Sequence, residues 1–367
     1  MSKVKKQHFV PRFYLSRWVL KTNPEQIYVF NKDKSRQYTA NIKDTASSKY
    51  FYDYPELNED DKSSWIKKLK DDDLLPPEQI NEMIKFTEEQ VLEQALCELE
   101  TINAPIIDSI IKKIDGFKAL PISYFLKHHI LSYSDITELS YYIATQYART
   151  EETRIAMEQI TKLMLKHFSD FTLLNIDKLE NDTELLEKMG KENFQSFAKS
   201  VKDGKFTKDS YTVEIDKDYT KINHIQILFQ LTEDIAKILE KYKWVVLVNY
   251  TNTPFYTSDS PVVKRANLDH PLYSYGFSSK GIEVVFPISP NYAINILEPS
   301  YIYEKTPTLL EHTLFDCSEE NVIHYNDLIV LQATSQVYSN QNDFKWAKKR
   351  VKETPVAANK NRQRIKG

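Results

Sequence analysis

Glycine is scarce in this chain, with only 6 glycines among 367 residues. Loops that cradle the phosphates of a nucleotide need several glycines, because the backbone must approach the phosphate without side chains in between. Only two cysteines occur, Cys97 and Cys317, and they lie far apart in the sequence. The chain therefore lacks a disulfide framework and any cysteine pair with metal-binding spacing. These absences argue against a glycine-loop nucleotide-binding fold and against a disulfide-rich domain.

Long apolar runs are also missing. No stretch of about 18 apolar residues occurs, so we expect no membrane-spanning helix and no membrane partner. The first residues are charged and no apolar segment follows them, so no signal peptide is readable. We therefore expect a cytoplasmic protein. Its oligomeric state cannot be read from the sequence.

Charge is distributed unevenly along the chain. Nine Lys or Arg and one Glu follow from residue 345 to the end, which gives this tail +8 and leaves −11 on the rest of a chain with net charge −3. We expect residues 346–367 to form a basic, disordered tail. Such a tail can contact phosphate, or it can simply be a solvated chain end.

The pattern of apolar residues changes twice along the chain. Strand-forming residues occupy 26–31 and 49–53, helical spacing dominates the middle, and apolar runs of strand length return after Tyr242. We expect helices over 76–101, 105–113, 135–168, 184–204, 221–242 and 318–339, and late strands over 244–250, 255–263, 281–286 and 292–297. The sequence predicts an α+β fold in which a helical middle region packs on a mixed, mainly antiparallel sheet built from the C-terminal third and the N-terminal strands. We expect one domain over 1–345, with a helical subdomain over 76–242.

The most distinctive motif opens the chain, at residues 7–15 (QHFVPRFYL). His8 is a candidate general base, metal ligand or phosphate contact, and Arg12 can clamp a phosphate or carboxylate through its planar guanidinium. The alternative is an aromatic plug in which His8 bonds to the backbone. In either case the large apolar residues predict that the motif is buried.

A second polar cluster follows an aromatic strand, at residues 257–261 (TSDSP). Asp259 is a candidate metal ligand or a carboxylate that orients His8, and we predict His8 and Asp259 to be a joint catalytic pair with Arg12 in the same pocket. Ser258 lacks the flanking glycines of a nucleophile elbow and is not assigned as a nucleophile. The alternative is that His8 and Asp259 are separate structural fixtures, with Asp259 closing its own turn.

One expected helix face carries several polar groups. Tyr142, Gln146, Arg149 and Thr153 are spaced three or four residues apart, so a continuous helix would present them together. Gln146 and Arg149 could bind an anion or a base edge there, or they could be a solvated helix edge.

Four carboxylates could hold a divalent cation such as Mg²⁺ or Mn²⁺. They are Glu93, Glu100, Asp259 and Glu283.

Three segments together resemble a bacterial family catalogued as domain of unknown function 4238. The first is residues 7–11 with Tyr14 and Leu15, and the second is residues 257–262 followed by 286–290. The third is Asn326-Asp327 with Ala333 and Tyr338. The similarity runs from Gln7 to about Tyr338. It implies that His8, Pro11, Tyr14, Ser258, Asp259 and Pro261 matter, with Tyr14 and Ser258 as substrate-binding candidates, and it supplies no reaction.

Two functions fit these observations. The first is an enzyme that acts on nucleic acid or nucleotides, such as a metal-dependent nuclease of a bacterial (phage) defence or toxin system. The second is a non-catalytic binding or regulatory module that uses an aromatic-rich pocket. The acidic body argues against broad, nonspecific duplex binding.

Overall fold

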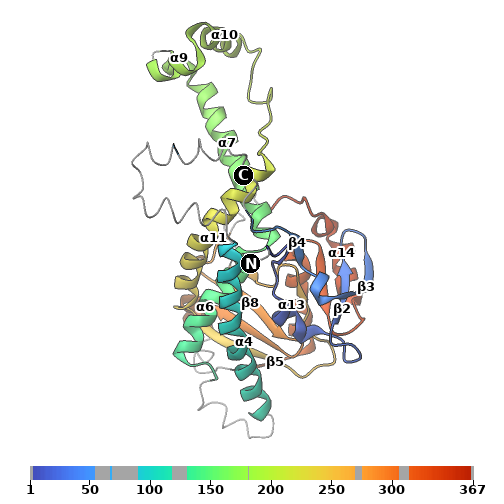
Figure 1. The fold of residues 1–367 in the computed structure, drawn as a ribbon. Helices are drawn as coiled ribbons and strands as arrows, with labels where there is room; N and C mark the ends of the chain where they lie inside the picture. The colour runs from blue at the N-terminus through green and yellow to red at the C-terminus, as the bar shows by residue number, and fades with distance from the viewer. Residues whose placement is uncertain are drawn as a thin grey trace. The chain divides into compact units, whose positions relative to one another are not determined.

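The computed structural model describes residues 3–53, 67, 90–117, 130–180, 182–268, 275–305 and 314–364 (Figure 1). The chain divides into two compact units. The first comprises residues 1–154 and 221–362, and the second comprises residues 155–220 and 363–367. The separate helical part is therefore shorter than the predicted subdomain 76–242. The reason is that the helices before residue 155 and after residue 220 contribute their apolar side chains to the core of the first unit.

A five-stranded sheet forms the centre of the first unit. Its strands lie in the order β10 (Leu314–Cys317), β5 (Lys243–Asn249), β9 (Tyr292–Leu297), β8 (Ile282–Ser289) and β7 (Val263–Ala266). Only the β10–β5 pair is parallel. The sheet is mixed and mainly antiparallel, as the sequence predicts.

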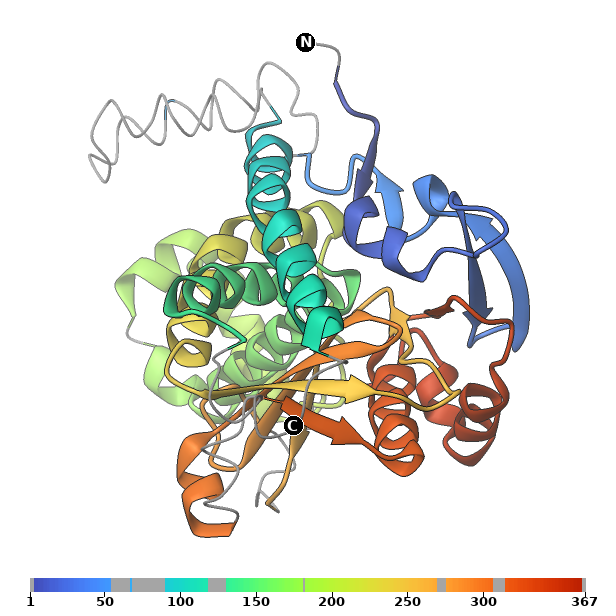
Figure 2. The ribbon, with the colours of Figure 1, turned by 90° about the horizontal axis from the view of Figure 1, so that it is seen from below.

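Helices cover both faces of this sheet. They are α4 (Val91–Phe117), α6 (Tyr133–Ala148), α11 (Lys217–Leu239), α12 (Pro299–Lys305) and α13 (Glu319–Gln332), and α14 (Lys345–Glu353) packs on α13. Alternate strand residues point to opposite faces. Figure 2 shows helices on both sides of the strands of this sheet. Val246 and Phe286 share a core with residues of α4, α6 and α11, whereas Leu247 and Val285 share a second core with residues of α13. Burial on both faces explains why β5, β8 and β9 are continuous apolar runs in the sequence.

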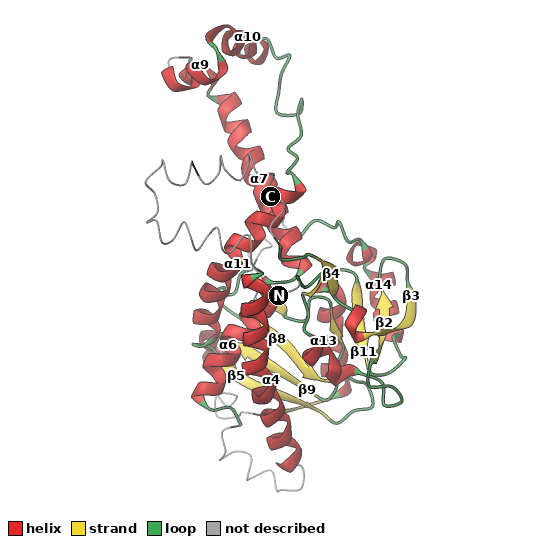
Figure 3. Cartoon of the chain, in the orientation of Figure 1, coloured by secondary structure: helices red, strands yellow, loops and turns green. Residues whose placement is uncertain are grey.

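The N-terminal strands join two other sheets. The order in a four-stranded antiparallel sheet is β3 (Arg36–Asn41), β2 (Gln26–Asn31), β11 (Gln336–Ser339) and β6 (Thr257–Ser258). The short strands β1 (Lys6–His8) and β4 (Ser47–Lys49) form a pair of their own. Figure 3 shows these strands beside the helices. The α+β class is confirmed, and the N-terminal strands pair with C-terminal strands in a sheet separate from the five-stranded one.

The predicted helix over 135–168 is two helices. α6 ends at Ala148 and α7 (Glu151–Leu174) begins after Thr150, whose hydroxyl accepts a hydrogen bond from the Thr153 amide at 3.3 Å. A threonine that caps the next helix in this way stabilises a break between the two. Thr153 therefore belongs to a different helix from Gln146.

The C-terminal segment also differs from the expected disordered tail. The predicted helix over 318–339 ends at Gln332 and is followed by β11, then by α14 and a 3₁₀ turn at Pro355–Ala358. Beyond the turn, the Arg362 guanidinium is buried, bonds the Ala333 carbonyl at 3.0 Å and pairs with Glu152 at 2.6 Å. Small and aromatic side chains between the basic residues allow this packing, since Phe344, Ala347 and Ala357 are buried.

The second unit is helical where it is described. It contains the greater part of α7 together with α8 (Ile176–Leu179), α9 (Thr183–Met189) and α10 (Lys191–Lys202). Gly190, with φ of +79°, separates α9 from α10 where the sequence predicts one helix.

The first part of the predicted helix 76–101 lies outside the described residues, and α4 continues its second part through Pro105. Within the described ranges, no helix combines the length and the apolar character needed to cross a membrane.

Candidate functional site

The opening motif is buried, as predicted. Phe9, Val10, Tyr14 and Leu15 lie in the core, and Phe13 packs against it. The Tyr14 hydroxyl donates to the Pro287 carbonyl at 2.6 Å and contacts the Thr257 hydroxyl at 2.8 Å. Its ring stacks on Phe286, with ring centroids 5.0 Å apart. Tyr14 thus joins the opening motif to the polar turn and to strand β8, and burial raises its pKa.

Helix α6 holds the backbone of the opening motif. Gln146 donates to the Phe9 carbonyl at 2.8 Å and Arg149 donates to the His8 carbonyl at 2.6 Å. Arg149 also pairs with Glu100 at 2.8 Å, although its side chain is only 2% exposed. Burial lowers the pKa of Arg149, but Tyr52 and Glu100 outweigh this and hold the pKa above its usual value. The structure therefore brings Gln146 and Arg149 to His8, where both bind protein groups.

Asp259 receives three backbone hydrogen bonds. The amides of Thr334, Ser335 and Gln336 donate to its carboxylate at 2.8, 2.8 and 2.9 Å. Burial raises the pKa of Asp259 to about 6, while nearby Lys32 and the amides oppose the increase. The carboxylate is therefore ionised at pH 7 and fixes the chain between α13 and β11.

The neighbouring turn is closed in a similar way. The Ser258 hydroxyl donates to the Ser260 carbonyl at 2.8 Å and accepts from the Ser260 amide at 3.1 Å. Ser258 is fully buried. The proton and one lone pair of this hydroxyl therefore form hydrogen bonds within the turn.

His8 and Asp259 have different neighbours. The largest effects of charged side chains on the pKa of Asp259 come from Lys32 and Glu152, and the largest on the pKa of His8 come from Arg12 and Arg149. Their role as a joint catalytic pair stays a prediction.

The alternation of β1 determines which way each polar side chain of the motif points. Lys6 and His8 face the 3₁₀ turn Ile42–Asp44, where Lys6 bonds Asp44 and the backbone of Ile42 bonds His8. Gln7 points the other way and binds the Tyr52 amide at 2.7 Å. Burial lowers the pKa of His8 to about 4, so the ring is neutral at pH 7. Within the described part of the chain, the His8 Nε2 atom has no hydrogen-bond partner.

Cationic side chains gather on the His8 side of β1. We call this surface the N-terminal basic face; it consists of the cations Lys6, Arg12, Lys43 and Lys49 around the neutral His8. Lys6 and Lys49 are directly opposite in the β1–β4 pair, and side chains at paired positions share a face. Arg12 is exposed, and its guanidinium makes no hydrogen bond or ion pair with any residue that the structure describes.

This surface is not apparent in the sequence. Its lysines are isolated along the chain, and only the β1–β4 pairing brings them together. A strand of three residues with a partner 40 positions away leaves little local signal, although the lysine-rich start of the chain is visible in the sequence.

The four candidate metal-binding carboxylates lie at three places. Glu93 and Glu100 are both near Arg149, Asp259 binds the amides described above, and Glu283 accepts hydrogen bonds from Asn295 at 2.8 Å and Tyr325 at 3.0 Å. In the described ranges, no three His, Cys, Asp or Glu side chains are grouped so that they could hold a metal ion.

Glu93 is chemically distinct from the other carboxylates. Burial, helped by Glu100 and Asp53, raises the pKa of Glu93 to about 7 in spite of nearby Arg149. Its Oε2 atom is buried and has no partner among the described residues. The sequence suggests Glu93 only as a metal ligand, whereas burial in the folded chain brings its pKa close to neutral pH.

The chain belongs to the family described as "Protein of unknown function (DUF4238)", whose model matches residues 6–343. The resemblance noted from three short segments is therefore confirmed over almost the same range. No curated protein and no solved structure matches the chain.

Proposed function

We propose that this protein binds a nucleic acid or nucleotide through the N-terminal basic face. The observation that carries the proposal is Arg12, an exposed guanidinium with no partner among the described residues, next to the half-buried His8. A guanidinium can donate two parallel hydrogen bonds to one phosphate. An arginine that is already paired within the protein could not offer these bonds to a ligand.

The other members of the face supply charge around Arg12. Lys6, Lys43 and Lys49 are exposed, and Asp44, which bonds Lys6, is the acidic residue of the adjacent turn. Four cations against one carboxylate favour a polyanion, even though the whole chain is acidic.

His8 has a different role in this proposal. Its ring is neutral at pH 7 and its Nε2 atom is buried, so the exposed contacts to a ligand come from Arg12 and the lysines. These contacts are to phosphate, which RNA, DNA and nucleotides share.

Fluorescence anisotropy with short labelled RNA and DNA tests the proposal. The Arg12→Ala variant should weaken binding about tenfold and reduce the slope of log Kd against log salt by about one. Arg36→Ala, which removes an exposed arginine outside the face, is the matched control and should change neither quantity. Equal affinities of the two variants would overturn the proposal.

The second candidate function is hydrolysis of the bound ligand, in which the protein would act as a metal-dependent nuclease. The specific observation in its favour is Glu93, because a carboxyl group with a pKa near the working pH is suited to general acid–base catalysis. Incubation of the labelled RNA and DNA with Mg²⁺ or Mn²⁺ tests it. Product that forms with the intact chain and disappears with Glu93→Gln and His8→Ala supports catalysis; binding without product supports the binding module.

A further inference from the structure

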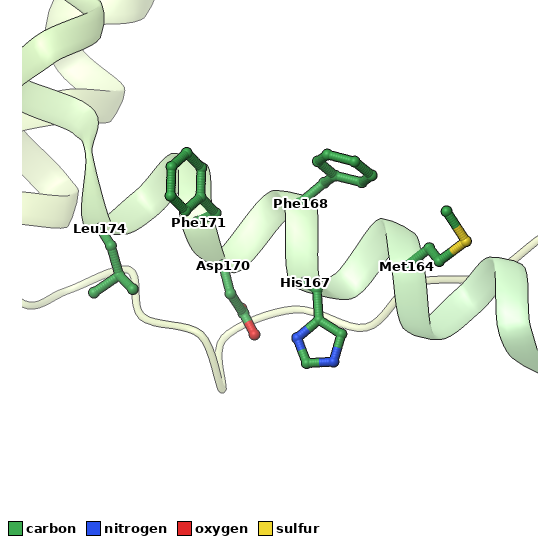
Figure 4. Close-up of a pocket in the computed structure, with 6 residues that line it drawn as sticks. All are labelled: Met164, His167, Phe168, Asp170, Phe171 and Leu174. Carbon is green, nitrogen blue, oxygen red and sulfur yellow. The ribbon is translucent and has the colours of Figure 1, made fainter. Parts of the chain in front are cut away.

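The segment of α7 in the second unit exposes a row of large apolar side chains. Phe168, Phe171 and Leu174 are 65%, 64% and 84% exposed, and Ile160 and Met164 are exposed as well. Figure 4 shows side chains of this row projecting from successive turns of the helix. A shallow hollow of about 620 Å³ is lined by residues of the last three turns, namely Met164, His167, Phe168, Asp170, Phe171 and Leu174.

The spacing of the row is that of a helix–helix seam. Ile160, Met164, Phe168, Phe171 and Leu174 follow one another at intervals of four, four, three and three residues. At 100° per residue they cover a stripe roughly 120° wide, which is the width of a face that packs on another element. The core of the second unit does not use this stripe, because it is built from Ile176, Phe194 and Ala198.

The stripe is almost uncharged, which restricts what can cover it. Asp170 is the charged residue at its border, and it pairs with Lys166 at 2.8 Å and accepts a hydrogen bond from Tyr211 at 2.7 Å. A nucleic acid requires free cations, which the border of the hollow lacks. A partner with a strongly charged surface would find no opposite charge on the neutral stripe and would gain no electrostatic attraction from it. The stripe therefore fits another neutral, apolar helix face.

We propose that this stripe binds the same stripe of a second copy of the chain as an antiparallel helix pair. A two-fold interface requires a surface that complements itself, and a neutral stripe does not repel its own copy. The midpoint of the row lies near His167, so the two-fold axis passes there. Ile160 of one copy then faces Leu174 of the other, and Met164 faces Phe171.

The size of the contact sets its strength. Residues 160–174 extend over about 21 Å of helix, and a pair of such stripes buries on the order of 1,000 Å² in total, near the lower limit for a specific interface. We therefore expect a dimer that dissociates at micromolar concentrations.

Sedimentation velocity of the full chain between about 1 and about 100 µM tests the proposal. The wild-type protein should shift from monomer to dimer over this range. Phe168→Glu combined with Phe171→Glu should raise the dimer Kd at least 100-fold, because dimerisation would then bury four uncompensated carboxylates. The control is Tyr303→Glu in α12, which places the same charge on a side chain that is equally exposed, at 64%. A wild-type monomer at 100 µM, or equal Kd values for both variants, would overturn the proposal.

Disulfide formation tests the geometry in a Cys97→Ser background, which removes the exposed native thiol. His167→Cys lies close to the two-fold axis and should form a dimer by oxidation on its own. Ile160→Cys and Leu174→Cys should each form little dimer alone and should cross-link when the two proteins are mixed. Self-linking of Ile160→Cys as rapid as that of His167→Cys would indicate parallel helices and overturn the antiparallel arrangement.

Discussion

At the residue scale, the polar side chains in apolar segments dock those segments together. Asp259 binds three amides, Arg149 binds the His8 carbonyl, and Lys32 binds the carbonyls of Val330 and Ala333 at 2.7 and 2.6 Å. Each satisfies backbone groups that the fold buries, and an unsatisfied buried group is costly. From the sequence alone, such a residue cannot be distinguished from a catalytic one, since both interrupt an apolar run.

Replacing Asp259 separates these two roles. Asp259→Asn removes the charge that holds three amides, so we expect the free energy of unfolding to fall by about 2–4 kcal/mol. Asp33→Asn, at an exposed position, should change it by less than about 0.5 kcal/mol. Chemical denaturation followed by circular dichroism measures both. An Asp259→Asn protein that keeps its full stability but loses ligand binding would instead favour the joint site with His8.

Glu93 gives a pH-dependent prediction at the same scale. Its pKa is raised in the folded chain to about 7, from an ordinary value of 4.5, so the folded state binds more protons than the unfolded state between these values. The contribution of Glu93 to stability is therefore present below about pH 4.5 and is lost as pH rises through 7. Glu93→Gln should make the protein more stable than wild type at pH 8, by roughly 1–2 kcal/mol after allowance for partial exposure, with no gain at pH 4.5. If the difference in the free energy of unfolding between Glu93→Gln and wild type is the same at pH 8 and at pH 4.5, the pKa of Glu93 is not raised by burial.

At the element scale, the C-terminal segment acts as a clamp. Arg362 bonds the Ala333 carbonyl and pairs with Glu152, so it ties the chain end to the residues that follow α13 and to the start of α7. We expect Arg362→Ala to lower the free energy of unfolding by about 2–4 kcal/mol, because Glu152 loses its ion-pair partner in a nearly buried position. Thermal melts of this variant and of Arg364→Ala provide the comparison. A chain truncated after residue 343 with an unchanged melting temperature would contradict the clamp and restore the disordered tail.

Elements with strong local patterns could be predicted from the sequence. The bounds of β2 and β9 match the predicted 26–31 and 292–297, because β-branched and aromatic residues fill them between turn residues. The break at Thr150 was not predictable from periodicity, since the apolar spacing continues across it. The start of the second helix is instead set by the Thr150 hydroxyl, which caps it. The β1–β4 pair could not be predicted, because its two strands are far apart in the sequence and meet only in the folded chain. The N-terminal basic face depends on this pair and could not be predicted for the same reason.

The candidate site was predictable in part. Gln146 and Arg149 share a helix face by spacing alone, and the structure brings both to the His8 segment. Their partners, the backbone carbonyls of Phe9 and His8, have no sequence signal, because every residue carries a carbonyl. The raised pKa of Glu93 follows from burial and from neighbouring carboxylates, which are tertiary properties.

At the scale of the whole molecule, the chain passes between the two units after Arg154, before Lys221 and again after Arg362, and the first two of these points bound residues 155–220. These two points lie close together in the first unit, because Arg154 Nε donates to His224 Nδ1 at 3.1 Å. Beyond the second junction, α11 contributes Ile225, Leu228 and Ile235 to the main core. The first unit therefore contains its own core without residues 155–220.

Excision of the second unit tests this organisation and separates the two proposals. Residues 155–220 can be replaced by about six Gly and Ser residues, which reach roughly 13 Å, enough to join Arg154 to Lys221. We expect the shortened chain to melt within about 5 °C of the full chain, because the main core and the Arg154–His224 bond are retained. It should bind RNA as the full chain does, since the N-terminal basic face lies in the first unit, and it should be monomeric at about 100 µM, since the α7 stripe is gone. A folded, shortened chain that still dimerises would place the dimer contact elsewhere, and one that no longer binds RNA would place the ligand site in the second unit. A chain that fails to fold would show that the first unit depends on the second, against the division inferred from the core.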